Sequence, residues 1–148
     1  MIEKILSHCD ADTEMAGQAL AENIISGKID CAKPIFVALY GELGQGKTAF
    51  VRGMAKLLAP DCHVSSPTYS IINMYEGKNN FYHLDLYRIT SDDDLYSVGF
   101  YELFDDSRAV IAAEWCENIP YALPDERVEV RIAHLGDCER EITISIKK

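Results

Sequence analysis

The amino-acid sequence predicts an α/β fold: a three-layer sandwich with a mixed, mainly parallel central sheet and added β-hairpins. Two short apolar runs, residues 35–40 and 110–113, are rich in strand-forming side chains, as expected of strands that are buried on both faces. Segments with helical periodicity flank the first run, and alternating segments separated by turn residues predict the hairpins.

Length and composition are typical of one globular domain. At roughly 150 residues per domain, the 148 residues predict a single domain spanning 1–148. Apolar residues make up 48% and charged residues 26%, which excludes disordered and collagen-like classes. The longest apolar run is far shorter than the roughly 20 residues of a membrane helix. The N-terminal residues lack the apolar core of a signal peptide, so we expect a cytoplasmic protein with no membrane partner.

The charge balance narrows the choice of partners. The formal net charge is −10, from 14 basic and 24 acidic residues, and the arginines are scattered. Direct binding to a nucleic acid normally requires clustered cations, so we expect another component to hold any nucleic acid. Five cysteines without a CxxC pair favour free thiols over disulfides or a zinc site.

Two helices are predicted in the first half of the chain. The first covers residues 13–26, with Asp12 as its cap and Gly27 at its end. The second covers residues 47–58 and is stopped by Pro60. The apolar run at 35–40 lies between them as a buried strand.

Two hairpins and a capped helix are predicted in the second half. Residues 69–75 and 81–87 form one hairpin, and residues 127–133 and 140–146 form the other. Between them, Ser91 and the three acids after it have the pattern of an N-cap and first turn, with the helix reaching toward Phe104. A metal site at these acids is the weaker alternative, because a helix dipole favours acids there.

One motif, GELGQGKT at residues 41–48, fits the phosphate-binding P-loop pattern G-x-x-x-x-G-K-[ST]. A strand precedes it and a helix follows it, so the fold class becomes P-loop NTPase-like. Glycines let main-chain amides surround phosphate oxygens, a lysine reaches the β and γ phosphates, and a hydroxyl binds Mg²⁺. The motif predicts ATP and Mg²⁺ as cofactors, bound through Gly41, Glu42, Leu43, Gly44, Gln45, Gly46, Lys47 and Thr48.

Acids at strand ends are candidates for the reaction centre. Glu114 directly follows the 110–113 strand, where a Mg²⁺ ligand belongs, although it also suits a strand that reaches solvent. Asp85 lies within a predicted strand and shares a face with His83 and Tyr87. That face either approaches the γ phosphate or forms the surface of an edge hairpin. His83 alone is interpreted as structural.

Three further features have open interpretations. Residues 65–68 form either a switch that senses the γ phosphate or an inert proline turn. Trp115 either gates the site, binds a partner or packs in the core. Six tyrosines between residues 69 and 101 raise the possibility of a protein-binding face.

Sequence motifs outside the P-loop indicate the nucleotide preference and the reaction class. The N/T-K-x-D element of guanine-specific proteins is absent from the sequence, which favours ATP. A small-molecule kinase would carry an arginine-bearing lid, whereas Arg108 is the only arginine between residues 90 and 126.

The ordered set of motifs resembles the bacterial TsaE (YjeE) family of ATPases. It consists of GELGQGKT, SPTY at 66–69, HLDLYR at 83–88, GFYEL at 99–103 and EW at 114–115. The resemblance implies a role in threonylcarbamoylation of the adenosine next to the anticodon of tRNA. It also implies partnership with the TsaB and TsaD proteins, which would contact the tRNA, and an indirect role for ATP hydrolysis.

Carried over to this sequence, the family pattern implies specific roles. Lys47, Asp85 and Glu114 become catalytic residues, and Thr48 and Glu114 become Mg²⁺ ligands. Thr13 near the adenine, Trp115 and Arg140 join the P-loop as nucleotide contacts. Two positions depart from the family pattern: Gln45 replaces a small residue, and Tyr69 replaces the commoner Phe.

The leading hypothesis is an ATPase whose γ-phosphate state controls docking to TsaB–TsaD. The alternatives are a nucleotide-gated binding module in which hydrolysis is not required, and a small-molecule kinase.

Overall fold

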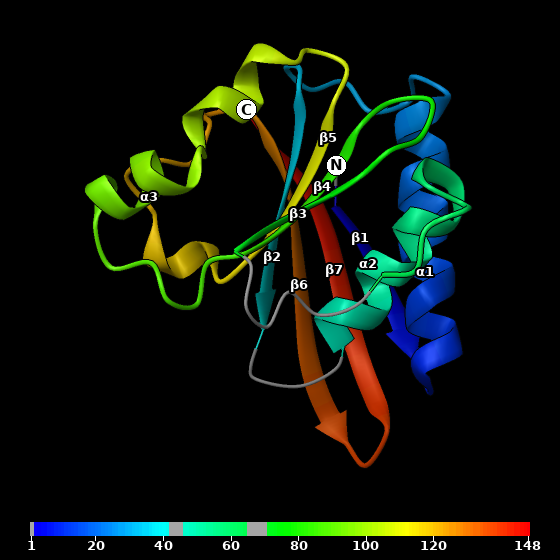
Figure 1. The fold of residues 1–148 in the computed structure, drawn as a ribbon. Coiled ribbons are helices and arrows are strands. Elements are labelled where there is room, and N and C mark those ends of the chain that lie inside the picture. Colours follow the sequence, from blue (N-terminus) through cyan, green and yellow to red (C-terminus); the bar gives the residue numbers. More distant parts are fainter. Residues whose placement is uncertain (1, 42–45, 65–70) are drawn as a thin grey trace.

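The computed structural model describes residues 2–41, 46–64 and 71–148 (Figure 1). Seven strands, three α-helices and two short 3₁₀-helices follow one another in these ranges. In chain order they are β1 (Ile2–Ser7), α1 (Asp10–Ile25), β2 (Ile35–Gly41), α2 (Gly46–Leu58), β3 (Ile72–Tyr75), β4 (Phe81–Asp85), α3 (Asp92–Val98), η1 (Tyr101–Asp105), β5 (Val110–Glu114), η2 (Cys116–Asn118), β6 (Arg127–Gly136) and β7 (Glu139–Lys147).

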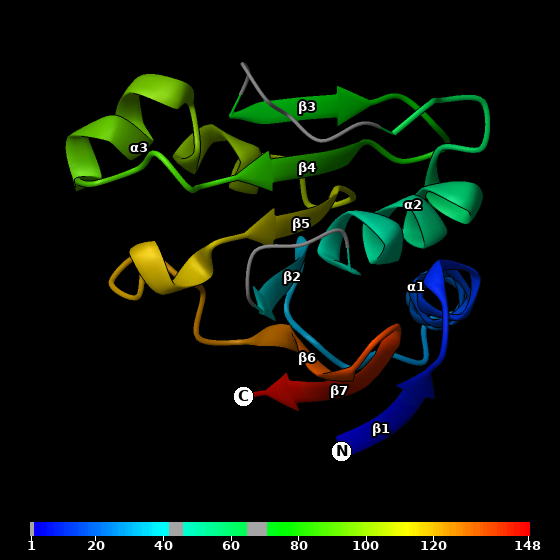
Figure 2. The ribbon, with the colours of Figure 1, turned by 90° about the horizontal axis from the view of Figure 1, so that it is seen from below.

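The strands form one mixed sheet with the order β1-β7-β6-β2-β5-β4-β3. The central strands β6, β2, β5 and β4 are parallel, and antiparallel partners extend the sheet at both edges. Figure 2 shows α1 and α2 over one face of the sheet and α3 with the 3₁₀-helices over the other. The predicted fold class, a three-layer α/β sandwich, is confirmed.

Each face of the sheet has its own apolar core. Alternation along β2 sends Val37 and Leu39 toward α1 and α2, whereas Phe36 and Ala38 face the other layer. All four side chains have no exposed surface. The 35–40 run is therefore a strand buried on both faces, as predicted.

The first helix begins earlier than its sequence pattern predicts. α1 begins at Asp10, not at residue 13, and its N-cap is Cys9. Asp12 is not the cap: its carboxylate lies inside the first turn and accepts a hydrogen bond from the main-chain nitrogen of His8 at 3.0 Å. The predicted role of Gly27 at the end of the helix is confirmed, since this residue follows the helix with φ +78.

The N-terminal strand β1 was not predicted. It pairs antiparallel with β7 along the edge of the sheet, from Ile2 opposite Ser145 to Ser7 opposite Arg140. Its sequence does not alternate, and Ile2 and Leu6 are 70% and 50% exposed. β1 is therefore specified by its partner strand, not by a buried face.

The remaining predicted elements are present with small shifts. α2 covers the predicted residues, β4 ends two residues early at Asp85, and the β6–β7 hairpin is longer than predicted. The start of the 69–75 segment lies outside the described residues. No helix in the described ranges is both long and apolar enough to cross a bilayer, and all five cysteines are free thiols.

The acids after Ser91 cap a helix, as predicted. The Ser91 hydroxyl accepts a hydrogen bond from the main-chain nitrogen of Asp94 at 3.3 Å. The Asp94 carboxylate accepts two hydrogen bonds from Thr90, which lower its pKa. The predicted single helix reaching toward Phe104 is wrong: α3 ends at Val98, because its C-cap residue Gly99 is left-handed with φ +83, and a separate 3₁₀-helix, η1, covers Tyr101–Asp105.

Two glycines let α1 and α2 approach closely over the sheet. A Cβ atom at Gly17 would overlap the carbonyl of Phe50, and one at Gly53 would overlap the carbonyl of Glu14. Beside this contact, the Glu14 carboxylate accepts a hydrogen bond from Arg52 at 2.9 Å. The crossing sets the position of α2 and hence of the residues at its start.

We expect Gly53→Ala to lower the free energy of unfolding by about 2–3 kcal/mol, because the methyl group forces the helices apart. Met15→Ala, at a side chain on α1 that is 66% exposed, is the matched control and should change it by less than about 0.5 kcal/mol. Urea unfolding measures both variants. Equal stabilities would contradict the close-packing argument.

Candidate functional site

The C-terminal ends of parallel strands bring the predicted site residues to one edge of the sheet. Glu114, the last residue of β5, lies opposite Leu39 of β2 on one side and Asp85 of β4 on the other. β2 ends at Gly41 and α2 begins at Gly46, so the described ends of the P-loop meet the same edge. Its residues 42–45, and the predicted switch with Tyr69, lie outside the described residues.

Lys47 places a positive charge inside this edge. Its side chain is in the first turn of α2, and the residue is only 3% exposed. The Nζ atom donates a hydrogen bond to the Gly41 carbonyl at 3.0 Å and lies 4.2 Å from the centre of the Trp115 ring. Among the described residues no carboxylate forms an ion pair with it. A buried cation held by a carbonyl and a ring is electrostatically incomplete and favours an anion beside it.

The two described glycines of the motif lie in close contact with β6 and β7. A Cβ atom at Gly41, where φ is +156, would come within 2.7 Å of the Ile132 carbonyl. One at Gly46 would lie 3.3 Å from Cγ2 of Ile132 and 3.5 Å from Cδ of Arg140. A side chain at Gly41 would therefore overlap the main chain of β6, and one at Gly46 would press against Ile132 and Arg140.

His83 and Glu114 form a buried pair. Nε2 of His83 lies 2.6 Å from Oε2 of Glu114, and the two residues are 0% and 5% exposed. An ionised carboxylate only accepts, so Nε2 is the donor in the pair. Nδ1 of His83 is buried with no partner among the described residues. His83 thus holds one oxygen of Glu114 and leaves Oε1 for another partner.

Asp85 lies beside this pair with a perturbed carboxyl group. Burial is the main cause that raises its pKa above the usual 3.8, and the charge of Glu114 adds to the effect. A hydrogen bond from the main-chain nitrogen of Tyr87, at 3.1 Å, acts in the opposite direction. The β3–β4 hairpin does lie at the edge of the sheet, as the surface alternative requires. The predicted face is divided, however: His83 is fully buried, Asp85 is half-buried and Tyr87 is 57% exposed.

Trp115 lies at the border of the site. Its backbone has φ +64, and its half-buried ring packs edge-on against Tyr87 with centroids 5.0 Å apart. Tyr87 is outside β4, so it does not continue the strand face predicted for it. The indole is therefore not an ordinary core side chain, since one face is in contact with the Lys47 ammonium.

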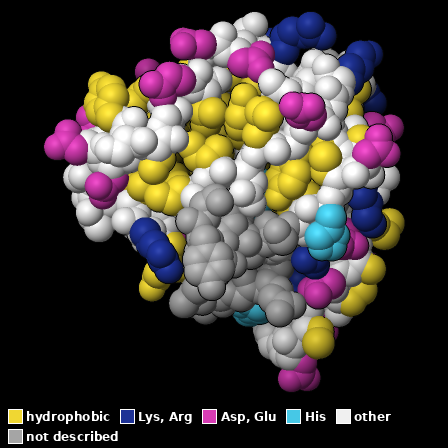
Figure 3. All heavy atoms as spheres, viewed as in Figure 1, with side chains coloured by type: hydrophobic (Ala, Val, Ile, Leu, Met, Phe, Trp, Pro, Cys, Tyr) yellow, Lys and Arg dark blue, Asp and Glu magenta, His cyan; other side chains and the backbone are white. Residues whose placement is uncertain are grey.

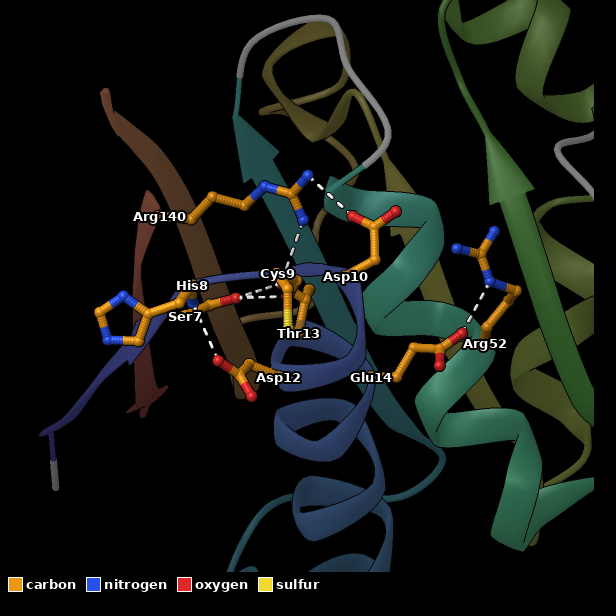
Figure 4. A network of polar contacts seen from close by, with 9 residues as sticks. All are labelled: Ser7, His8, Cys9, Asp10, Asp12, Thr13, Glu14, Arg52 and Arg140. Atoms are coloured by element: carbon orange, nitrogen blue, oxygen red, sulfur yellow. Dashed lines mark hydrogen bonds and ion pairs between the residues drawn. The ribbon is translucent and has the colours of Figure 1, made fainter. Parts of the chain in front are cut away.

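A second cation, Arg140 of β7, lies on the other side of the start of α2 (Figure 4). Its Nη2 atom forms an ion pair with Asp10 at 2.9 Å, and Nη1 donates to the Thr13 hydroxyl at 3.1 Å. Its Nε atom is buried without a partner among the described residues. Thr13 has no exposed surface and also contacts the Ser7 hydroxyl at 2.7 Å. Arg140 is thus the closer of the two residues to Gly46, and Thr13 contacts its guanidinium group.

The oxygen groups at this edge suit an open Mg²⁺ site better than a metal site that is closed entirely by protein ligands. Nowhere in the described ranges do three His, Cys, Asp or Glu side chains gather around one point. Glu114 and Asp85 supply carboxylates, and the half-buried Thr48 supplies a hydroxyl from the first turn of α2. Mg²⁺ usually takes one or two carboxylates and completes its shell with water and phosphate oxygens. The residues present therefore fit Mg²⁺ bound together with a triphosphate.

Sequence reasoning missed two of these contacts. It interpreted His83 as structural and did not predict its bond to Glu114, and it did not bring Asp10 to Arg140. Alternation placed His83 and Asp85 on one face, but nothing local indicates that β5 is the neighbouring strand. Neither contact has a sequence signal of its own, because each joins segments far apart in the chain.

Comparisons with known proteins agree on one family. A family model described as "Threonylcarbamoyl adenosine biosynthesis protein TsaE" matches residues 7–142. A protein of Treponema pallidum named tRNA threonylcarbamoyladenosine biosynthesis protein TsaE is 31% identical, over 96% of this chain and 99% of that protein. A protein of the same name from Bacillus subtilis is 41% identical, over 77% of this chain and 72% of that protein. The crystal structure of Bacillus subtilis YdiB superposes with a TM-score of 0.71 and 28% identity, covering 100% of this chain and 87% of that one.

The raised pKa of Asp85 predicts a pH-dependent cost to stability. Between pH 3.8 and its native pKa the folded state holds the proton more tightly, so the free energy of unfolding falls as pH rises through that window. Asp85→Asn should therefore gain stability relative to wild type as pH rises, with the full gain at neutral pH.

Asp94→Asn is the control with the opposite sign. The pKa of Asp94 is lowered, so this variant should lose stability relative to wild type as pH rises. Urea unfolding from pH 2 to 8 measures both, because the window of Asp94 lies below pH 3.8 and that of Asp85 lies above it. A constant difference between Asp85→Asn and wild type across this range would contradict the burial argument.

Proposed function

The chain belongs to the TsaE family of threonylcarbamoyladenosine biosynthesis, and we propose that within this process it acts as a Mg²⁺-dependent ATPase. The buried, positively charged Lys47 at the carboxyl edge of the parallel strands is the observation that carries this proposal. In open α/β sheets, ligands bind outside this edge, and a P-loop lysine there contacts the terminal phosphates.

Main-chain and side-chain groups of the P-loop would bind the triphosphate. The N-terminus of α2 brings a partial positive charge to the site, and the missing side chains of Gly41 and Gly46 let the ends of the loop lie close to Ile132 and Arg140. Arg140 would add a second positive charge beside Gly46, since its Nε atom lacks a partner among the described residues. In this arrangement Thr13 acts on the nucleotide through Arg140, whose guanidinium it contacts.

Thr48 and Glu114 are the proposed ligands of Mg²⁺. When bound, the ion would offset the charge that develops on the phosphates during transfer. His83 contributes by orientation: its hydrogen bond holds one oxygen of Glu114, so that the carboxylate presents a fixed direction. Such outer partners commonly decide how well a carboxylate is positioned.

Asp85 is the proposed residue for the attacking water. A carboxyl group whose pKa is raised by burial holds a proton more readily than a solvated one. Asp85 lies next to Glu114 on the neighbouring strand, so it can orient water directly or through the metal. Lys47, Asp85 and Glu114 would then form the reaction centre.

We place this ATPase in a complex with TsaB and TsaD, which would hold the tRNA. The net charge of −10 is unfavourable for binding a polyanion directly. The γ-phosphate state would then act by changing how the chain docks to its partners. The small-molecule kinase alternative loses support, because Arg108 lies near the start of β5, at the opposite end from Glu114.

Lys47→Ala should abolish binding of Mg²⁺–ATP, because it removes the charge that faces the phosphates. Lys56→Ala is the matched control: Lys56 lies on the same helix, is 55% exposed and contacts Glu14, so binding should be unchanged. Isothermal titration calorimetry distinguishes them. The proposal fails if Lys47→Ala binds as tightly as Lys56→Ala.

Glu114→Gln should retain ATP binding but hydrolyse at least about 100-fold more slowly, within the range for loss of one transition-state interaction. Because this variant stays in the ATP-bound state, immobilised TsaB–TsaD should capture it in the presence of ATP at least as well as wild type. In the presence of ADP, capture should be poor. If it supports repeated rounds of tRNA modification without hydrolysis, the nucleotide-gated binding module is the correct function.

A further inference from the structure

A cavity of about 630 Å³ lies at the end of the molecule opposite Lys47. It is bounded by the ends of α1 and α2, the turn between β3 and β4, and the starts of β2 and β5. In Figure 1 this is the upper end, whereas β2 points downward to its carboxyl end. The volume is within the range typical of small-molecule sites.

The rim of the cavity is positively charged in a strongly acidic chain. Lys33, Lys78 and Arg108 line it from three separate segments, and none of its lining residues is Asp or Glu. All three cations are exposed, and within the described part of the chain none forms an ion pair. Figure 3 shows basic side chains gathered at the upper edge of the molecule.

The Asp106 carboxylate, two residues before Arg108 in the sequence, does not fully neutralise the three cations of the rim. The Asp106 carboxylate is held by the main-chain nitrogen of Arg108 at 3.1 Å and by the Asn80 amide at 3.4 Å. Two further carboxylates lie near the rim: Glu76 comes two residues before Lys78, and Glu126 accepts a hydrogen bond from the main-chain nitrogen of Ala32 at 2.8 Å, next to Lys33. The lining of the cavity itself carries three cations and no carboxylate, so its charge is opposite in sign to the net charge of the chain.

The interior of the cavity is apolar with one unmet polar atom. Ile24, Ile35, Leu58 and Val110 contribute hydrocarbon surface to its lining. The side-chain oxygen of Asn79, which also lines the cavity, is buried with no partner among the described residues. A ligand that donates one hydrogen bond would satisfy it.

We propose that this cavity binds a small amphipathic anion, a function beyond the ATPase. Its anionic head would lie among Lys33, Lys78 and Arg108, and its apolar body would cover Ile35 and Leu58. The charge sets the head group and the apolar lining sets the body, so a neutral compound of the same shape binds more weakly.

This site is separate from the nucleotide site. β2 runs the full distance between them, from Ile35 at the cavity to Gly41 at the P-loop. At about 3.3 Å per residue its seven residues place the two sites about 20 Å apart. ATP and the amphipathic anion therefore bind together without competing.

The probe for this site is anilinonaphthalene sulfonate, an aromatic anion whose fluorescence rises in apolar surroundings. We expect saturable binding of one probe to the full chain, with weaker binding of neutral phenylnaphthylamine. Lys33→Gln/Arg108→Gln should weaken sulfonate binding about tenfold, a loss of roughly 1.4 kcal/mol. Decanoate and decyl phosphate then compete with the probe, and their relative strength identifies a carboxylate or a phosphate head.

Two controls separate this proposal from the ATPase. Lys4→Gln/Arg131→Gln removes the same charge outside the cavity and should leave probe affinity unchanged. Lys47→Ala should also bind the probe as wild type does, even though it loses ATP. Equal probe affinity in Lys33→Gln/Arg108→Gln and wild type, or release of the probe by Mg²⁺–ATP, overturns the proposal.

Discussion

A buried ammonium group is the constraint on which this end of the molecule depends. Lys47 is almost fully buried, and its described contacts are a main-chain carbonyl and an aromatic face. Such a charge is tolerated only where the surrounding groups are fixed by packing. The α1–α2 crossing fixes the start of α2, and the register of β2, β4 and β5 fixes Glu114 and Asp85 around it. The fold therefore supports an arrangement of charges that would be unfavourable in a less rigid scaffold.

The N-terminal and C-terminal segments of the chain both place residues at the same edge of the sheet. β1 pairs with β7 so that Ser7 lies opposite Arg140, and α1 begins immediately after it. This explains why the helix starts at Asp10: from the first turn its carboxylate reaches Arg140, and Thr13 follows one turn later. The N-terminal strand contributes little apolar burial, but it orders the residues that hold the second cation of the site.

The sequence predicted what is encoded locally. α2, the buried strands and the Ser91 cap each depend on neighbouring residues, and each is found where the pattern placed it, whereas residues 42–45 of the P-loop motif lie outside the described residues. β1 was missed because an exposed edge strand lacks the alternation that a buried face imposes. The His83–Glu114 bond depends on which strands become neighbours, and periodicity within one strand does not contain that information. The sequence patterns thus indicate candidate residues, of which Asp85 and Glu114 end neighbouring strands, whereas the contacts that orient them were not predictable.

The distribution of cations in this acidic chain supports the two anion sites proposed for it. Several of its fourteen basic residues are paired with carboxylates, as Arg52 and Lys56 are with Glu14 and Lys148 is with Asp30. Arg140 is paired with Asp10 and lies with Lys47 at the carboxyl edge of the strands, whereas Lys33, Lys78 and Arg108 lie at the opposite end. Small groups of positive charge set in an acidic surface attract compact anions but repel an extended polyanion. The same charge pattern therefore supports the proposed nucleotide site at one end and is unfavourable for direct binding of tRNA by this chain.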